Sequence, residues 1–245
     1  MSNKVVELKN INKEYYIYKN NFGRILGILF GKKPSETIYA LKNVSLTIEK
    51  GERVYVFGKI NSGVSTLQKI MAGIVYPTSG KVITNGEINC YFGKAAGFDN
   101  EMTCMDNMYM RANVIGVPKE VIKEHEEEIV EFAEIENYKN IALKQALKGT
   151  PARLGLAVHL LKDTDIYLMD ENFSQGAVES KQKCEARFNE YIEAHPETTF
   201  IISVLGIPWA KKHCDRGIVL YKGEIVFDGP IEEAVQEYKE KYNKA

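Results

Sequence analysis

This 245-residue chain lacks an excess of charge of either sign, because 32 lysines and arginines face 33 aspartates and glutamates. The balance excludes the basic footprint typical of nucleic-acid binding and the acidic tail of a solvating arm. No run approaches the roughly 18 apolar residues that a transmembrane helix needs. The first residues, MSNKVVELKN, contain no apolar signal region. We therefore expect a soluble intracellular protein with no nucleic-acid partner.

Cysteine is scarce as well, and Cys90, Cys104, Cys184 and Cys214 show no C-x-x-C spacing. We expect buried, reduced thiols of a cytosolic protein rather than a disulfide framework or a zinc site. Hydrophobic residues make up 44% of the chain and charged residues 27%, close to the averages of globular proteins. A chain of this length buries enough surface to fold without a disulfide or a structural metal.

Apolar patterns predict buried strands that alternate with helices. Unbroken apolar runs indicate buried strands at 54–57, 166–169, 200–204 and 218–220. Alternating patterns indicate half-buried strands at 5–8 and 39–48, with further short strands within 81–92. Helices are expected at about 65–72 and 231–244, and an apolar stripe between acidic residues predicts a helical section over 118–138. This order favours an α/β core with a largely parallel sheet.

A glycine-containing loop follows the first buried strand. Residues 58–66, GKINSGVST, have the length and position of a phosphate-binding loop, G-x-x-x-x-G-K-[ST]. Such a loop lets consecutive backbone N–H groups point at phosphate oxygens beside a helix N-terminus. Gly58, Gly63 and Ser65 fit this motif, whereas Val64 stands in place of its lysine. By itself the partial motif is also compatible with an ordinary strand-to-helix turn.

Two acids follow a second buried strand, in the segment IYLMDE that ends in Asp170 and Glu171. A carboxylate at such a strand end is placed to hold phosphate-bound magnesium, and the next one to polarise a water molecule. A solvated strand end is the alternative. Together with the loop, however, this segment indicates a nucleotide site.

Six segments then carry a resemblance that covers nearly the whole chain. They are YALKNVSLTIEKGERVYVFG, LQKIMAGIVYPTSGKV, AAGFDNEMTCMDNMYM, EIVEFAEIENY, KGTPARLGLAVHL and CDRGIVLYKGEIVFDGP. They resemble the nucleotide-binding subunits of ABC transporters, in the branch that exports O-antigen, capsule and teichoic-acid polysaccharides. The resemblance implies one ABC nucleotide-binding domain over 1–245. It also implies a mostly parallel core sheet, an antiparallel N-terminal β subdomain and a helical lobe over about 97–160.

The family's functional positions imply a set of nucleotide contacts. Tyr15 matches the aromatic residue that stacks on adenine, a contact of ~1–3 kcal/mol, although Tyr16 and Tyr18 lie close enough to compete. Asn61 replaces a loop glycine and tolerates positive φ better than most residues. Further contacts are implied for the loop residues Gly58, Lys59, Asn61, Ser62, Gly63, Val64, Ser65 and Thr66.

The resemblance also implies a metal site and a catalytic base. Ser65 and Asp170 would hold magnesium through the nucleotide, and Glu171 would be the base. At the signature motif, Lys148 and Gly149 would face the nucleotide of a second subunit. ATP and Mg2+ are therefore the expected cofactors.

Several positions depart from the family pattern. Val64 replaces the phosphate lysine, Leu205 the switch histidine and Lys148 the signature serine. No glutamine occurs near Lys94, although this branch often lacks it, and Ala177 stands where an aspartate is usual. The replaced residues would all act on the same phosphoryl-transfer transition state. Their joint replacement therefore indicates weak nucleotide binding and weak or absent hydrolysis. Lys59 and Lys148 are candidates for partial rescue; solvated surface lysines are the alternative.

An insertion over 19–37 is apolar between Phe22 and Phe30 and ends in Gly31-Lys32-Lys33. Such a segment is compatible with a membrane surface or a partner helix. The resemblance favours contact with the transmembrane subunit, and a loop packed on its own domain is the alternative. The sequence ends in a Lys/Glu-rich helix, so we expect no C-terminal glycan-binding domain.

The sequence leaves three hypotheses for the function of this chain, each from a different class of protein. The first is the ATP-binding subunit of an exporter that moves a polysaccharide or lipid-linked glycan. It would lie on the cytoplasmic membrane through a permease and pair with a second nucleotide-binding subunit as a homo- or heterodimer. The second is a pseudo-ATPase that acts as a structural or regulatory partner without turnover. The third, a soluble ABC protein of DNA repair or translation, is disfavoured because the sequence has no tandem cassette, long coiled-coil insertion or basic tract.

Overall fold

The computed structural model describes residues 3–22, 25, 30, 33–92, 97–170 and 178–242. The chain forms two compact units. The first unit contains residues 1–85 and 201–245, and the second contains residues 86–200. Along the chain, strand β7 (Thr199–Ile202) ends the second unit and begins the return to the first.

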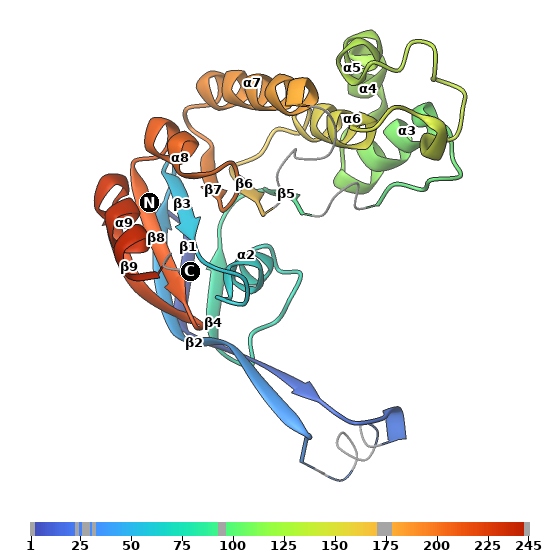
Figure 1. Ribbon diagram of the computed structural model, residues 1–245. Helices are drawn as coiled ribbons and strands as arrows, with labels where there is room; N and C mark the ends of the chain where they lie inside the picture. The colour runs from blue at the N-terminus through green and yellow to red at the C-terminus, as the bar shows by residue number, and fades with distance from the viewer. Residues whose placement is uncertain are drawn as a thin grey trace. The chain divides into compact units, whose positions relative to one another are not determined.

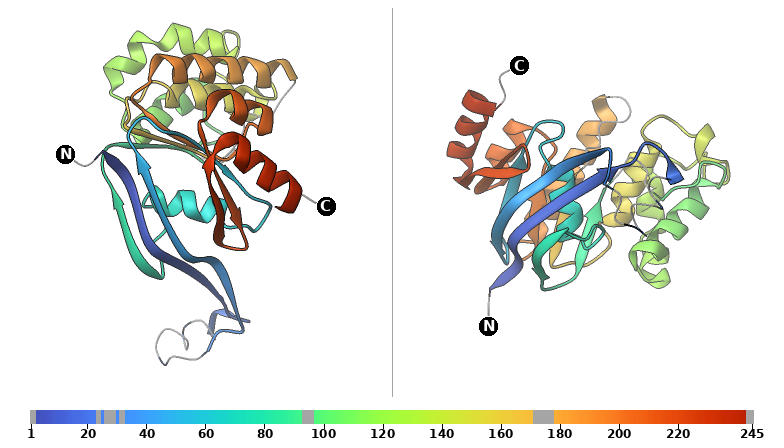
Figure 2. Two further views of the ribbon diagram at one scale, coloured as in Figure 1. Left: turned by 90° about the vertical axis from the view of Figure 1, so that its left-hand side faces the viewer. Right: turned by 90° about the horizontal axis from the view of Figure 1, so that it is seen from below.

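An antiparallel sheet with the strand order β2-β1-β4 forms one layer of the first unit. Its strands are β1 (Lys4–Ile17), β2 (Glu36–Glu49) and β4 (Ser79–Thr84). The pairing of β1 with β4 ends at Asn12, whereas the pairing of β1 with β2 continues to Ile17. Beyond β4 the two long strands therefore run on as a two-stranded ribbon (Figures 1 and 2).

The second layer of this unit is built on buried strands. Strand β3 (Arg53–Phe57) pairs in parallel with β8 (Arg216–Tyr221), and β8 pairs antiparallel with β9 (Glu224–Pro230). The same unit contains three helices: α2 (Val64–Met71), α8 (Ile207–His213) and α9 (Ile231–Glu237). The chain then continues in a π-helical turn, η2 (Tyr238–Tyr242), in which the Tyr238 ring stacks on Phe57 with centroids 5.3 Å apart.

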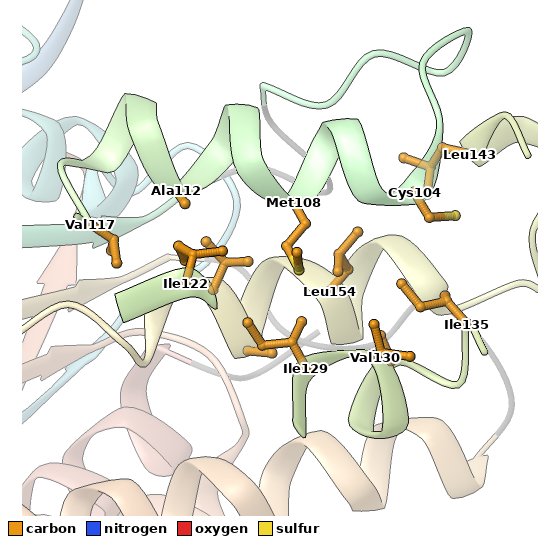
Figure 3. Close-up of a cluster of buried hydrophobic side chains, with 13 residues drawn as sticks. Cys104, Met108, Ala112, Val117, Ile122, Ile129, Val130, Ile135, Leu143 and Leu154 are labelled. Atoms are coloured by element: carbon orange, nitrogen blue, oxygen red, sulfur yellow. The ribbon is translucent and has the colours of Figure 1, made fainter. Parts of the chain in front are cut away.

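The second unit combines a parallel strand pair with a group of helices. Strand β5 (Ile88–Tyr91) pairs in parallel with β6 (Ile166–Met169). The helices are α3 (Cys104–Ile115), α4 (Lys119–Glu124), α5 (Glu126–Ala133), the 3-10 turn η1 (Leu143–Gln145), α6 (Thr150–His159) and α7 (Val178–Ala194). Side chains from α3, α4, α5 and α6 form one buried apolar cluster (Figure 3).

A polar network is enclosed in the second unit beside this cluster. Arg111 donates from Nε and Nη2 to Nε2 of His159, at 3.1 and 2.7 Å. An arginine only donates, so His159 must be neutral and carry its proton on Nδ1, which lies 2.8 Å from Oδ1 of Asn89. Asn89 in turn donates to the His159 carbonyl at 2.9 Å. The network thus ties α3 and α6 to β5, and burial is the main cause that lowers the pKa of His159 to about 3.

The mixed α/β class predicted from the sequence is confirmed, with differences in detail. The section expected to be helical over 118–138 is two helices, α4 and α5, that meet at His125 and end where Glu134 takes φ of 58°. The strand expected at 200–204 ends at Ile202, and Leu205 and Gly206 then turn the chain with positive φ. The four cysteines are free thiols, as expected, but only Cys104, Cys184 and Cys214 are buried, whereas Cys90 is half-buried. Burial raises the pKa of Cys184 and of Cys214 to about 12.

Candidate nucleotide-binding site

The loop between β3 and α2 is the centre of the candidate site. Buried apolar residues bring β3 to Phe57, and α2 begins at Val64, so residues 58–63 must reverse the chain within a few residues. Asn61 has φ of 65° and Gly63 has φ of 105°. The position at which asparagine replaces the usual glycine therefore does adopt the left-handed conformation that asparagine tolerates.

The loop closes tightly on itself. A Cβ atom added at Gly58 would collide with Oγ of Ser62 and would lie 2.6 Å from Cγ2 of Val64, so only glycine fits there. Ser62 is 4% exposed, and its Oγ has no hydrogen-bond partner among the described residues. A buried hydroxyl without a partner is costly, and a phosphate oxygen in the loop would satisfy it. This arrangement fits a bound nucleotide phosphate.

Neighbouring strands hold the back of the loop. The N–H of Gly223 donates to the Ser62 carbonyl at 2.9 Å, and the N–H of Lys42 donates to the Gly223 carbonyl at 2.8 Å. A Cβ atom at Gly63 would collide with the carbonyl oxygen of Ala40. Sequence reasoning missed these supports, although the Lys222-Gly223 pair between two strands is a recognisable turn signal.

Helix α2 offers its N-terminus to the loop. Val64 is the first helical residue, followed by an exposed Ser65 and a half-buried Thr66. Lys59 lies in the exposed part of the loop beside Ile60. No acidic residue occupies the first turn of α2, so nothing there opposes an anion at the helix N-terminus. The lysine that the motif would place at position 64 is replaced by an apolar side chain.

Tyr15 lies on the ribbon in the same unit as the loop. Its ring is 5.0 Å from Nζ of Lys13, which donates to the carbonyl of Tyr76 after α2 at 2.9 Å. Tyr16, one residue on, points to the opposite face because strand side chains alternate, and its hydroxyl donates to Glu14 at 2.7 Å. Tyr15 and Tyr16 therefore lie on opposite faces of the ribbon, so at most one of the two could stack on the same adenine.

A second turn of the first unit carries the predicted switch position. Leu205 has φ of 71°, an unusual conformation for a bulky residue, and Gly206 follows with φ of 87°. The backbone N–H of Gly206 donates to the hydroxyl oxygen of Tyr55 on β3 at 3.2 Å. Burial of this hydroxyl raises the pKa of Tyr55 well above its usual range. Sequence reasoning did not single out Tyr55.

The remaining predicted residues belong to the second unit. Asp170 follows β6, whose four residues are fully buried, and its N–H donates to the Tyr91 carbonyl at 3.4 Å. Glu171, Ala177 and Lys94 lie outside the described residues. Within the described part of the chain, no group of three or more His, Cys, Asp or Glu side chains is arranged to hold a metal ion.

The signature segment precedes helix α6. Lys148 is exposed, and Gly149 has φ of 95° at the residue before the helix. Arg153, 2% exposed, donates to the Ala133 carbonyl at 3.1 and 3.0 Å and to Ser180 Oγ at 2.8 Å. It also pairs with Glu134, whose pKa is lowered first by the hydrogen bond from Lys183 and further by Arg153. The segment is thus anchored by a buried arginine while Lys148 faces outward.

A buried strand, a tight glycine-turned loop and an open helix N-terminus define a phosphate-binding domain of the P-loop type. A family model described as "ABC transporter" matches residues 41–174. The chain belongs to the ABC transporter family, which confirms the resemblance seen in the sequence. Among the residues that the structure describes, no helix is both long enough and apolar enough to cross a membrane.

The relatives and a structural neighbour agree with this assignment. A "Teichoic acids export ATP-binding protein TagH" of Listeria monocytogenes is 33% identical over 96% of this chain and 70% of its own length. The protein of the same name from Bacillus anthracis is 31% identical over 98% of this chain but only 44% of its own length. A dimeric post-hydrolysis structure of the ATP-binding cassette MJ0796, bound to ADP and Pi, has a TM-score of 0.70. It is 24% identical, covers 92% of this chain and 98% of its own, and shows the fold alone.

Proposed function

We propose that this chain is the ATP-binding subunit of an ABC exporter for teichoic acid or a related lipid-linked glycan, with a weak nucleotide site and impaired hydrolysis. Relatives that match almost the whole chain are named for teichoic acid export and ATP binding. One observation carries the weak-site part of the proposal: Val64, not a lysine, begins α2 at the end of a tight loop in which Asn61 and Gly63 take positive φ and only glycine fits at position 58.

The nucleotide would be held mainly by backbone and hydroxyl groups. The residues 58–66 would surround the phosphates with N–H groups, and Ser62 would use its buried hydroxyl. Ser65 and Asp170 would hold magnesium, and Tyr15 would stack on adenine. When bound, MgATP supplies a phosphoryl group for transfer to water. With Val64 in place of lysine, the chain lacks a positive charge at position 64 that would contact the β- and γ-phosphates.

We infer impaired hydrolysis because three positions that the family uses in catalysis are all replaced in this chain. Phosphoryl transfer depends on several charges acting on one transition state, so the losses at Val64, Leu205 and Lys148 reinforce each other. ABC sites combine the phosphate loop of one subunit with the signature of another, and this chain departs at both. An intact partner would therefore give two incomplete sites, and a homodimer would give two sites with every defect.

The proposed partners are a transmembrane permease and a second nucleotide-binding subunit, either a copy of this chain or a relative. The chain would lie peripherally on the cytoplasmic face of the membrane through the permease, with residues 19–37 on the membrane side. We keep the single-domain assignment over 1–245, with a helical lobe at about 97–160, as part of the proposal. MJ0796 has been seen as a dimer, which is a precedent for such pairing.

A pseudo-ATPase that acts as a structural or regulatory subunit is the second candidate function, because the departures touch the loop, the switch turn and the signature. The two candidates share the nucleotide site and differ in turnover. Nucleotide binding tests what they share. Calorimetry with MgATP should give a dissociation constant weaker than micromolar, since loss of the charge-assisted lysine contact removes roughly 1.5–3 kcal/mol. A sub-micromolar constant would show that Lys59 or another group replaces the lysine, and no binding at millimolar MgATP would remove the nucleotide site itself.

A further inference from the structure

Hydrogen bonds tie strand β1 to the segment that follows α2. The N–H of Thr78 donates to the Asn12 carbonyl at 2.8 Å, and Oγ1 of Thr78 accepts from the N–H of Glu14 at 2.9 Å. Between these two residues of β1, Nζ of Lys13 donates to the Tyr76 carbonyl at 2.9 Å. Helix α2 starts at the phosphate loop, so this segment links the loop to β1 within one unit of the fold.

The ammonium group of Lys13 also lies over the ring of Tyr15. The distance from Nζ to the ring centroid is 5.0 Å, which is within the range of a cation–π contact. An aromatic ring has two faces, and Lys13 covers one of them. Tyr15 is nevertheless 40% exposed, so part of the ring is open to a ligand. A planar base could therefore stack on this ring only from the side opposite Lys13.

We propose that Lys13 is a positioning residue for the nucleotide base: it fixes the Tyr15 ring against the end of α2 and leaves one ring face for the base. This inference rests on the proposed nucleotide site. An exposed side chain on a strand loses rotational freedom when it binds a ligand, and a ring that is already held loses less. Tyr16 is placed differently, because its hydroxyl donates to Glu14 on the other face of the ribbon.

Calorimetry with two ligands tests the role of Lys13. MgATP carries the base, whereas magnesium tripolyphosphate offers three phosphates without ribose or base, so the wild type should bind MgATP more tightly. Lys13→Met, which keeps an unbranched side chain without the charge, should weaken MgATP binding about fivefold and leave tripolyphosphate binding unchanged. Lys13→Arg should keep most of the MgATP affinity, because a guanidinium group also stacks on a ring and donates hydrogen bonds.

A double-mutant cycle shows whether Lys13 acts through the ring. Tyr15→Leu alone should weaken MgATP binding about tenfold, because the stacking surface is lost. Adding Lys13→Met to Tyr15→Leu should cause no further loss, since the ring that Lys13 positions is then absent. A lysine that only keeps the strand folded would instead weaken both ligands, with or without the ring.

Lys9→Met is the matched control, because Lys9 is an exposed lysine of the same strand that pairs with Glu7. It should leave the affinity for both ligands unchanged. The proposal is overturned if Lys13→Met weakens MgATP and tripolyphosphate equally, or if its effect persists in the Tyr15→Leu protein. Equal affinity of the wild type for the two ligands would also overturn it, while the phosphate site would stand. Binding of neither ligand at millimolar concentration would remove the proposed nucleotide site itself.

Discussion

The hydroxyl oxygen of Tyr55 accepts the backbone N–H of Gly206 at 3.2 Å, which joins strand β3 to the turn that contains the predicted switch position. Leu205 occupies that turn with φ of 71°. A bulky residue in this conformation is strained by about 1–2 kcal/mol. The turn thus has a defined, strained shape, and the side chain that it carries at position 205 is apolar.

The first prediction concerns this hydrogen bond. Tyr55→Phe removes the acceptor and should lower the free energy of unfolding by about 0.5–1.5 kcal/mol. The amide of Gly206 should exchange with deuterium several-fold faster, while amides in β9 keep their rates. Tyr76→Phe is the control, because Tyr76 is 83% exposed. Unchanged exchange at Gly206 in the Tyr55→Phe protein would mean that the hydroxyl does not hold the turn.

A second prediction compares two glycines with positive φ. At Gly63 an alanine Cβ would collide with the Ala40 carbonyl, whereas at Gly73 nothing lies within 4 Å of it. Gly73→Ala should cost about 1 kcal/mol from backbone strain alone. Gly63→Ala should cost roughly 1–3 kcal/mol more, because the backbone of β2 cannot yield easily. Urea unfolding of both proteins measures the difference, and equal stabilities would contradict the supporting role of Ala40.

Restoring the lysine gives a third prediction. Val64→Lys should tighten MgATP binding ten- to hundred-fold, because it restores a charge-assisted contact with the phosphates. Turnover should stay at the wild-type level, since Leu205 and Lys148 remain. Val64→Gln, similar in length to lysine but uncharged, is the control and should tighten binding far less. Rapid hydrolysis by the Val64→Lys protein would show that the lysine alone was missing.

The enclosed network around His159 predicts how stability depends on pH. In the folded chain the pKa of His159 lies at about 3, below the ordinary value of 6.5. Between these values the unfolded chain binds a proton that the folded chain does not, so stability is present above pH 6.5 and falls as the pH decreases. The contribution has a slope of at most about 1.4 kcal/mol per pH unit.

Urea unfolding at pH 7.5 and pH 5 measures this effect. The wild type should lose stability at pH 5, and His159→Gln should lose less, because glutamine does not titrate and still offers an acceptor to Arg111. His195→Gln is the matched control, since this ring is only half-buried after α7. If His159→Gln and the wild type showed the same loss, the neutral histidine would not be the cause.

The sequence was sufficient for features that depend on local patterns. Apolar runs located β3, β6 and β8, and Gly58 and Gly63 marked the tight loop between β3 and α2 that we propose binds phosphate. It was insufficient where distant segments decide the geometry. Nothing near Ala40 or Tyr55 in the sequence indicates that they support the loop and the switch turn, because both contacts join residues far apart in the chain. Helix α3 had a local signal that went unused: Thr103 caps it by accepting from the N–H of Asp106 at 3.0 Å.

Phosphate release by the chain assembled with its permease tests the proposed impairment most directly. The decisive comparison is between the wild type and Glu171→Gln, which removes the proposed base without changing the size of the side chain. We predict a wild-type rate close to background that Glu171→Gln changes little, because under the proposal the departures at Val64, Leu205 and Lys148 together impair transfer. A wild-type rate well above background that Glu171→Gln abolishes would contradict the account and show that the chain is a working ATPase.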